Sequence, residues 1–403
     1  MRFSGFTDEW VSYKIGDISK TYSGGTPSTS KREYYEGNIP FIKSGEIGNE
    51  VTEQYINEEA INNSSAKKVQ KGDLLLALYG ATSGEVAISK IDGAINQAVL
   101  KIDNKMNNYF QYNYFVKYKD QIIHKYLQGG QGNLSANIIK KLEFYYPNLE
   151  EQQKISNYLL LIDNKIELLE KKHHEYQNFK KYLMQQIFAQ KLRFADSDSC
   201  WKEISLKDIG TFYRGHSYNS TNVADEGLLV LRSNNIQGNV LDFSEDGLQF
   251  VDKDCKKELE LQKNDIVICM SNGTRRLVGK SAEYTGNYEN KVTVGAFCSI
   301  FRTKNKLAKY LFQTESYKKN LYLILAGTNI NNLKNSDLEK FKFNIPTNES
   351  EINKIHDLFV SIDNKIDYNK KQFEEITLFK KGLLQQMFVV QLILSLLQNK
   401  KHI

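Results

Sequence analysis

The sequence predicts an α+β protein with a pseudo-twofold internal repeat, in which two mixed α/β globules alternate with two long helices that are able to form a coiled coil. First, the chain matches itself at an offset of about 191 to 200 residues. Second, each copy opens with short β-branched and aromatic runs between Gly, Asn and Ser turns, which is typical of short strands. Third, each copy ends in about 40 residues with helical apolar spacing.

The repeat divides the chain into two similar halves. Residues 10–18 (WVSYKIGDI) return as residues 201–209 (WKEISLKDI), an offset of 191 (201 minus 10). Further along, residues 70–73 (QKGD) return as residues 262–265 (QKND), and both segments lead into an apolar strand. We therefore expect four parts, which are a globule over 1–148, a long helix with a linker over 149–191, a second globule over 192–347, and a second long helix with a C-terminal tail over 348–403.

Within each globule the pattern alternates between strands and helices. In the first globule, residues 37–42 and 74–78 are rich in apolar and β-branched residues and predict strands, and residues 109–126 predict a helix. In the second, residues 291–301 predict a strand and residues 307–325 a helix. Each globule is therefore expected to be a mixed α/β unit with its own core.

The two long helices follow from apolar residues that recur at alternating steps of three and four. The first contains no Pro or Gly from Glu150 to Phe188, and at ~1.5 Å per residue about 39 residues span roughly 58 Å, more than one globule needs for its core. Residues 162–166 (IDNKI) recur unchanged as residues 362–366. We expect one set of residues on each helix to form the coiled-coil seam or to contact a partner protein. These residues are Leu159, Ile162, Ile166, Leu169, Tyr176, Lys180, Leu183 and Ile187, and Phe359, Ile362, Ile366, Phe373, Ile376, Lys380, Leu383 and Met387.

Four polar residues interrupt this apolar seam, namely His173, Lys180, Asn369 and Lys380. Polar seam residues can select one register and one partner. Alternatively, the pattern has drifted and these side chains extend out of a loose seam toward solvent. Both interpretations stay open, and Lys180 and Lys380 favour the first because both copies contain this lysine.

Composition excludes several classes of protein. With 40% hydrophobic and 25% charged residues, the chain can bury cores and is not expected to be disordered.

No run of about 18 apolar residues is present, and the N-terminus lacks an apolar signal segment, so we expect a cytoplasmic protein without a membrane partner. The four cysteines lie outside Cys-x-x-Cys pairs and are expected to be reduced. The net charge of +6 permits a polyanionic partner without requiring one.

Short motifs recur in the same order in both halves. The first half contains residues 22–28 (YSGGTPS), 71–75 (KGDLL), 96–98 (NQA) and 151–155 (EQQKI). Together with the repeated long helices, these motifs resemble the specificity (S) subunit of type I restriction-modification enzymes, over essentially the whole chain. Residues 193–194 repeat residues 2–3 (RF), so the second long helix should return close to the N-terminus.

The resemblance implies a DNA-binding subunit that is not catalytic by itself. Each globule would be a target recognition domain that reads one half of a bipartite site in double-stranded DNA. The two long helices would pair as an antiparallel coiled coil, set the half-site spacing and dock two methyltransferase subunits, which use S-adenosylmethionine to methylate adenine. Two restriction and translocase subunits, bound through the methyltransferase subunits, would use ATP and Mg²⁺. No cofactor is expected for this chain itself.

Candidate DNA-contacting residues follow from chemistry, because Arg, Lys, His, Asn, Gln, Ser and Thr on loops can contact base edges or phosphates. They should differ between the globules where the two read different bases. In the first globule they are Ser23, Thr26, Ser28, Lys31, Lys43, Thr82, Ser83, Gln97, Gln131 and Asn133. In the second they are Arg214, His216, Arg232, Asn234, Asn235, Asn272, Thr274, Arg275, Arg276, Asn329 and Asn331. Each of them can instead be a solvated loop residue or a turn former.

Enzymatic motifs are weak in this sequence, and we expect no catalytic residues and no metal site. Residues 279–281 (GKS) resemble the end of a phosphate-binding loop, but Thr274 stands where that loop requires its first glycine. No two prolines are adjacent, so the chain lacks the Asn/Asp-Pro-Pro-aromatic loop of adenine methyltransferases. Two alternatives remain, which are a stand-alone DNA-binding regulator with a coiled-coil spacer and a coiled-coil scaffold with lectin-like or peptide-binding heads.

The C-terminal tail, residues 389–403, has no counterpart in the first half of the chain. It could extend the coiled coil, cover the N-terminal segment, or be a sequence altered after Phe388.

Overall fold

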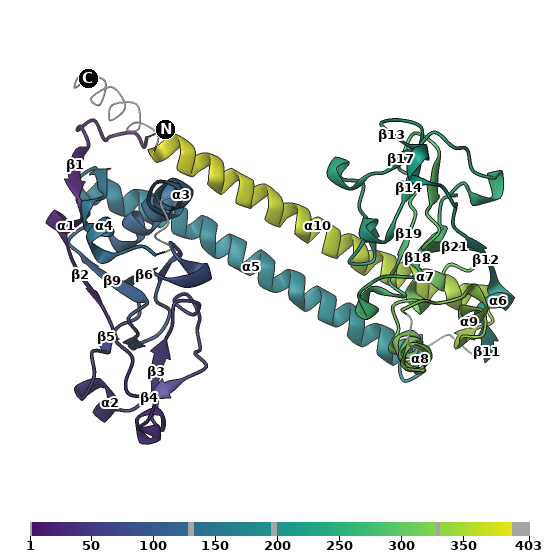
Figure 1. The fold of residues 1–403 in the computed structure, drawn as a ribbon, viewed down its shortest axis with the longest axis horizontal. Helices are drawn as coiled ribbons and strands as arrows, with labels where there is room; N and C mark the ends of the chain where they lie inside the picture. Colours follow the sequence, from purple (N-terminus) through teal and green to yellow (C-terminus); the bar gives the residue numbers. More distant parts are fainter. Residues whose placement is uncertain (1, 128–132, 195–199, 328–330, 389–403) are drawn as a thin grey trace. The chain divides into compact units, whose positions relative to one another are not determined.

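The computed structural model describes residues 2–127, 133–194, 200–327 and 331–388. The chain divides into two compact units, of which unit 1 joins Met1–Lys171 to Lys370–Ile403 and unit 2 is Lys172–Asn369. Each unit contains one globule and part of both long helices, α5 (Leu149–Phe188) and α10 (Glu349–Phe388) (Figure 1). The C-terminal tail, residues 389–403, lies outside the described residues.

The globule of unit 1 is built on two four-stranded sheets. The first has the strand order β2-β9-β6-β7 and is antiparallel, and the second has the order β4-β3-β8-β5, in which β3 and β8 run parallel. A separate antiparallel pair joins β1 to β10. The elements are β1 (Val11–Lys14), α1 (Ile15–Ile18), β2 (Ser19–Ser23), β3 (Ile39–Ile42), β4 (Tyr55–Ile56), α2 (Glu58–Asn62), β5 (Lys67–Val69), β6 (Leu74–Ala77), β7 (Val86–Ile88), β8 (Gly93–Ile95), β9 (Val99–Asn104), α3 (Asn108–Leu127), α4 (Ala136–Lys141) and β10 (Glu143–Tyr146).

The globule of unit 2 repeats this plan with longer loops. Its antiparallel sheet has the order β12-β21-β18-β19, its second sheet has the order β13-β17-β14-β20 with β14 and β20 parallel, and β11 pairs with β22. The elements are β11 (Trp201–Ser205), α6 (Leu206–Ile209), β12 (Gly210–Arg214), β13 (Val223–Ala224), β14 (Leu228–Leu231), β15 (Ile236–Gln237), β16 (Val240–Leu241), β17 (Phe250–Val251), β18 (Ile266–Cys269), β19 (Ser281–Glu283), β20 (Val292–Val294), β21 (Cys298–Thr303), α7 (Ala308–Leu311), α8 (Glu315–Ala326), α9 (Asn335–Leu338) and β22 (Lys342–Pro346).

The central strands β6 and β18 are apolar throughout because each is covered on both faces. Side chains alternate along a strand, so Leu74 and Leu76 pack into the core that α3 and the long helices share, whereas Leu75 and Ala77 pack against the second sheet. In unit 2, Ile266 and Ile268 pack on the helical side, and Val267 and Cys269 on the other side. The predicted α+β class with two repeated globules and two long helices is confirmed.

One clear difference between the globules is the helical layer. Unit 1 has the single helix α3 of 20 residues, whereas the matching part of unit 2 is broken into α7 and α8. The break occurs at Thr314, whose side-chain oxygen accepts a hydrogen bond from the Tyr317 backbone N–H at 3.2 Å and caps α8. A threonine in this role satisfies a free N–H of the first helical turn.

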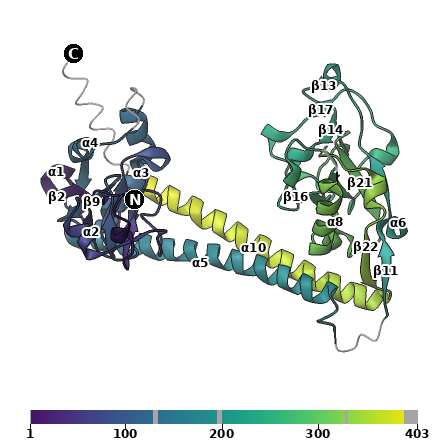
Figure 2. The ribbon, with the colours of Figure 1, turned by 60° about the horizontal axis from the view of Figure 1, so that its bottom comes forward.

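The long helices bury their apolar seam inside each unit. In unit 1, Leu159, Ile162 and Leu169 of α5 are buried, as are Leu383 and Met387 of α10. In unit 2, the buried seam residues are Leu183, Ile187, Phe359 and Ile362, and the half-buried positions of the two units are Ile166, Tyr176, Ile366, Phe373 and Ile376. The helices lie side by side in both views (Figures 1 and 2), and they run antiparallel because Lys380, late in α10, pairs with Asp163, early in α5.

The four polar residues of the seam differ in their bonding partners. Lys180 and Lys380 each form an ion pair with an aspartate of the facing helix, at 2.6 Å and 2.5 Å, so these lysines do not simply extend into solvent. Asn369 is 3% exposed, and neither of its amide atoms has a hydrogen-bond partner among the described residues. The Nε2 of His173 lies 3.0 Å from the amide nitrogen of Gln177.

The N-terminal segment and the end of α10 both pack in unit 1, as the repeated Arg-Phe pair predicts. The Arg2 guanidinium binds the buried Glu151 carboxylate at the start of α5 at 2.7 Å, and Arg193 binds the corresponding Glu351 at 3.2 Å in unit 2. Phe388, which is 1% exposed, packs among Trp10, Phe110 and Tyr114. The last turn of α10 therefore belongs to the core of the first globule.

This packing predicts the effect of truncating Phe388. Phe388→Ala should lower the free energy of unfolding of unit 1 by about 3–5 kcal/mol, the usual cost of removing a buried aromatic ring. The matched control is Phe379→Ala on the same helix, where the ring is 49% exposed and the loss should stay below about 1 kcal/mol. Urea unfolding followed by Trp10 fluorescence, in a Trp201→Phe background, measures both. Equal losses for the two variants would contradict the burial of Phe388.

Candidate nucleic-acid interface

The second globule has a polar cleft at one edge of its sheets. The parallel neighbours β14 and β20 end at this edge, and β12 and β18 also end there because both run antiparallel to β21, with Arg214 opposite Ser299 and Cys269 opposite Cys298. The cleft has a volume of about 590 Å³ and is lined by His216, Tyr218, Arg232, Ser233, Asn234, Ser271, Asn272, Gly273, Gly295, Ala296, Phe297 and Cys298. The topology thus gathers four loops that are far apart in sequence.

The cleft depends on a close approach of two backbones. A Cβ atom at Gly215 would lie 2.1 Å from the carbonyl oxygen of Gly295, and the Gly215 N–H donates to the Cys298 carbonyl at 3.0 Å. Only glycine fits there, which explains why a glycine follows β12. The next residue, His216, donates its backbone N–H to the Val294 carbonyl at 2.7 Å.

His216 lies in the wall of the cleft with its imidazole largely buried. It is 7% exposed, and burial, together with the nearby Lys253 ammonium, lowers the pKa of the ring below its usual value. Its Nε2 has no hydrogen-bond partner among the described residues, and its ring stacks on Tyr218 with centroids 6.4 Å apart. The neutral imidazole therefore retains hydrogen-bonding capacity that the protein does not use.

The amides and the guanidinium of the cleft are held by the fold while they line it. Asn272 donates to the Ser233 hydroxyl at 3.1 Å and accepts from the Thr274 backbone N–H at 2.9 Å. Arg232 and Asn234 each donate to the Gly247 carbonyl at 3.4 Å. These bonds orient the side chains in advance, which lowers the entropy that a ligand must remove on binding.

Sequence reasoning missed Phe297, which lies at the rim of the cleft. The residue is 70% exposed, although its backbone carbonyl is fixed by hydrogen bonds from Met270 N–H at 2.8 Å and Ser271 N–H at 3.2 Å. A large ring held outward on a rigid turn can contact a thymine methyl group or a base step. Its counterpart before β9 is Ala98, and this contrast between the repeats is the signal that could have revealed it.

Further arginines lie close in sequence to residues that line the cleft of the second globule. Arg214 and Arg276 are exposed, and the exposed Arg275 side chain donates to the Leu325 carbonyl. Thr274 is exposed beside them, and the Asn331 amide donates to the Gly273 carbonyl at 3.2 Å. Asn329 lies outside the described residues. Exposed arginines are suited to contact phosphate groups.

The first globule carries hydroxyl and amide groups at the corresponding strand ends. Thr26 donates to the Gln97 side-chain oxygen at 2.5 Å, so the loops after β2 and β8 meet. Lys43 is half-buried after β3, and Thr82 is half-buried after β6. The other candidates of this globule that lie at the surface are Ser23, Ser28, Lys31 and Asn133, and Gln131 lies outside the described residues.

Two predicted contact residues are buried in the loops that they stabilise. Asn235 is 2% exposed, and its amide donates to the carbonyls of Asp242 and Gly247 at 3.2 Å and 3.1 Å. Ser83 is 8% exposed and donates its hydroxyl to the Leu78 carbonyl at 2.9 Å. In this conformation neither polar group faces outward, so we assign both residues a supporting role rather than direct contact.

Neither a catalytic nucleophile nor a metal site stands out in the described part of the chain. Burial raises the pKa of the Cys298 thiol at the cleft to about 12, so the thiol stays protonated. Residues 2–127, 133–194, 200–327 and 331–388 contain no group of three His, Cys, Asp or Glu side chains placed to hold a metal ion. The helices in these ranges are all too short or too polar to cross a membrane.

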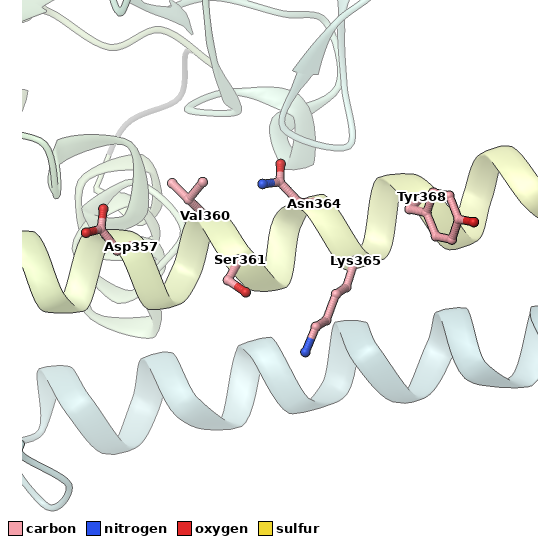
Figure 3. A pocket seen from close by; sticks show the side chains of 6 residues that line it. All are labelled: Asp357, Val360, Ser361, Asn364, Lys365 and Tyr368. Carbon is pink, nitrogen blue, oxygen red and sulfur yellow. The ribbon is translucent and has the colours of Figure 1, made fainter.

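A second candidate surface lies on the long helices. In unit 2, a groove of about 550 Å³ follows one face of α10 and is lined by Asp357, Val360, Ser361, Asn364, Lys365 and Tyr368 (Figure 3). Tyr368 is 65% exposed, and in unit 1 the corresponding face of α5 exposes Leu160, Leu161 and Leu168 at 41%, 68% and 58%. Each unit therefore presents one copy of an exposed helical surface with large apolar side chains, which is typical of a binding surface for another protein.

Comparisons with known proteins agree with this arrangement. The family model of the type I restriction modification DNA specificity domain matches twice, over residues 7–177 and 198–378. The type I restriction enzyme MjaVIII specificity subunit of Methanocaldococcus jannaschii is 23% identical over 94% of this chain and 91% of that protein. The EcoKI specificity subunit of Escherichia coli K12 is 29% identical over 44% of this chain and 39% of that protein.

A solved structure shows the same fold. The crystal structure of a type I restriction-modification S subunit from M. genitalium superposes with a TM-score of 0.63 at 16% identity, and the alignment covers 96% of this chain and 97% of that one. Since the family model covers most of both halves of the chain, the expected resemblance is confirmed, and this chain belongs to the family of type I restriction-modification DNA specificity subunits, whose domain it carries twice.

Proposed function

We propose that each globule reads one half of a bipartite DNA sequence through the loops at the strand ends described above. The single observation that carries this proposal is the cleft of unit 2, where Arg232, Asn234 and Asn272 meet, with exposed arginines close by in sequence. Donors and acceptors of these types match the edges of base pairs in the major groove, and exposed arginines match phosphates. The chain itself then contributes recognition and no bond chemistry.

The two globules are expected to read different half-sites. Their antiparallel sheets share one strand order and their second sheets share one parallel pair, but the loops at the strand ends differ, with amides, arginines and Phe297 in unit 2 and with hydroxyls, Gln97 and Lys43 in unit 1. Because sequence is read by side chains on loops while strands hold the loops in place, a shared scaffold with different loops supports two distinct readers.

An exchange of one globule tests this division of labour. Replacing residues 201–346 with the second globule of another family member should change one half of the methylated sequence and leave the other half intact. Mapping methyladenine in DNA from cells that make the hybrid with its partner subunits measures the result. A change in both halves would overturn the proposal that each globule reads independently.

Single substitutions separate base reading from phosphate binding. Asn234→Ala should relax the preference at one base pair by about 1–3 kcal/mol, the usual value of one direct amide–base contact. Arg276→Gln should weaken binding to all duplexes alike and reduce the slope of log affinity against log salt by about 1.

Binding of the complex to a duplex library at several salt concentrations measures both substitutions. The assignment of the cleft would be contradicted if Asn234→Ala lowered the affinity for all duplexes equally. It would also be contradicted if this variant changed the base preference in the half-site that the first globule reads.

We further infer that the helical surfaces dock two methyltransferase subunits, one in each unit. The support is that the exposed face of α5 in unit 1 and the groove on α10 in unit 2 occupy corresponding positions of the repeat. The docked subunits would bring S-adenosylmethionine and transfer its methyl group to an extruded adenine. Restriction subunits that use ATP and Mg²⁺ would join through them.

Charge insertion on these surfaces tests the docking. Leu168→Glu should remove one methyltransferase subunit, Tyr368→Glu should remove the other, and the double variant should bind neither, because a buried unpaired carboxylate disfavours an interface. The matched controls Glu170→Lys and Lys370→Glu also change charge at exposed positions, on another face of the same helices. Native mass spectrometry gives the stoichiometry, and loss of both subunits from either single variant would refute two equivalent sites.

A further inference from the structure

Two ion pairs of the same design link the long helices to the globules. In unit 1, the Lys380 ammonium of α10 lies 2.5 Å from the Asp163 carboxylate of α5. The Tyr109 hydroxyl of α3 donates to the other oxygen of Asp163, and the Lys380 nitrogen lies 5.8 Å from the centre of the Tyr112 ring. One carboxylate thus joins three helices, namely α3, α5 and α10.

Unit 2 repeats the arrangement with the roles of the long helices exchanged. The Lys180 ammonium of α5 lies 2.6 Å from the Asp363 carboxylate of α10. The Tyr310 hydroxyl donates to Asp363 at 3.2 Å, and Lys180 donates to the Gln313 side-chain oxygen at 3.1 Å. The Lys180 nitrogen also lies 5.4 Å from the centre of the Tyr310 ring.

Both pairs are largely removed from water. The lysine side chains are 16% and 13% exposed, and the aspartate side chains 30% and 24%. Burial and the neighbouring carboxylates raise the pKa of Tyr109 and Tyr310, so both hydroxyls keep their protons and donate them to the aspartates. Ions in such positions are tolerated only when they are paired.

Stability alone does not explain two buried ion pairs in an apolar seam. Replacing such a pair with apolar side chains of similar volume is commonly neutral or stabilising. The best-attested use of buried polar residues in coiled coils is the selection of one register. A seam of Leu, Ile and Phe alone repeats every seven residues, so outside the helix ends that are buried in the globule cores it does not itself select one register.

Either slide of one heptad would break both pairs. In one direction Lys180 would come opposite Lys370, while Asp163 would face Met387 and Asp363 would face Ile187. In the other direction Lys180 would come opposite His356, and Asp163 would face Phe373. In both directions the Asp163 carboxylate would face an apolar residue and lose its lysine, which strongly disfavours the slide.

We propose that the Lys180–Asp363 and Lys380–Asp163 pairs lock the register of the helix pair and thereby fix the number of base pairs between the half-sites that the complex accepts. The two ion pairs have the same spacing along the helices, because Lys180 follows Asp163 by 17 positions (180 minus 163) and Lys380 follows Asp363 by 17 positions (380 minus 363). The four residues are positioning residues that touch no DNA. The proposal rests on the proposed function, in which each globule reads one half-site.

The first test replaces both pairs with apolar side chains. The variant Asp163→Leu, Lys180→Met, Asp363→Leu, Lys380→Met should fold and still bind DNA with its partner subunits. Its preference for the natural spacer over spacers about three base pairs shorter or longer, the length of one heptad at ~1.5 Å per residue and ~3.4 Å per base pair, should fall at least tenfold. The matched control exchanges the ions (Asp163→Lys with Lys380→Asp, and Lys180→Asp with Asp363→Lys), keeps both attractions, and should retain the preference.

A second test reports the register without DNA. Ile166→Cys with Ile376→Cys places thiols on facing seam positions, and Ile166→Cys with Leu383→Cys places them one heptad apart. Cross-linking followed by mass spectrometry should give only the first disulfide in the otherwise natural chain and both disulfides in the apolar variant.

The outcomes of the two tests separate the two proposals. An apolar variant that keeps both its single cross-link and its spacer preference would overturn the register lock. Loss of the single cross-link with an unchanged spacer would overturn the link between register and spacing. A natural complex that binds no bipartite site would instead refute the proposed function, while the cross-links would still report the register.

Discussion

The fold depends on the burial of helix ends in the globule cores. The antiparallel sheet of unit 1 has an apolar face that α3 and the long helices cover, and Phe388 of α10 completes that core beside Trp10 and Phe110. In unit 2, Phe188 of α5 stacks on Phe359 with centroids 6.2 Å apart. Because each core needs both long helices, neither globule can change on its helical side without disturbing the coiled coil.

The cleft of unit 2 is built apart from this helical packing. Side chains of the loops that follow β12, β14 and β18 line it, and none of its lining residues belongs to α5 or α10. The strands beneath them hold the loops through pairings that depend on backbone groups, as in the register of Cys269 with Cys298. Recognition chemistry can therefore vary while the buried frame stays the same, which fits the helix segments that both copies share, such as residues 162–166 and 362–366, and the divergence of the loops.

Sequence patterns predicted the frame well and the cleft poorly, for physical reasons. The repeat, the long helices and their seam depend on periodicity, which is visible along the chain. The cleft depends on which strand ends meet, and this is set by pairings between distant segments. Asn235 and Ser83 have the chemistry of contact residues but are buried, whereas Phe297 lacked that chemistry and lies exposed at the rim. Residue type alone does not show which way a loop side chain points.

The modest net charge of +6 reflects a chain in which basic and acidic residues nearly balance. Several basic side chains are already paired inside the protein, such as Lys101 with Asp73 and Arg302 with Asp265. A cation that is bound to a carboxylate releases no counterion from DNA, so these residues add little to the electrostatic part of binding. Exposed arginines such as Arg276 lie instead close in sequence to residues of the cleft, where a phosphate contact also orients the loops that read bases.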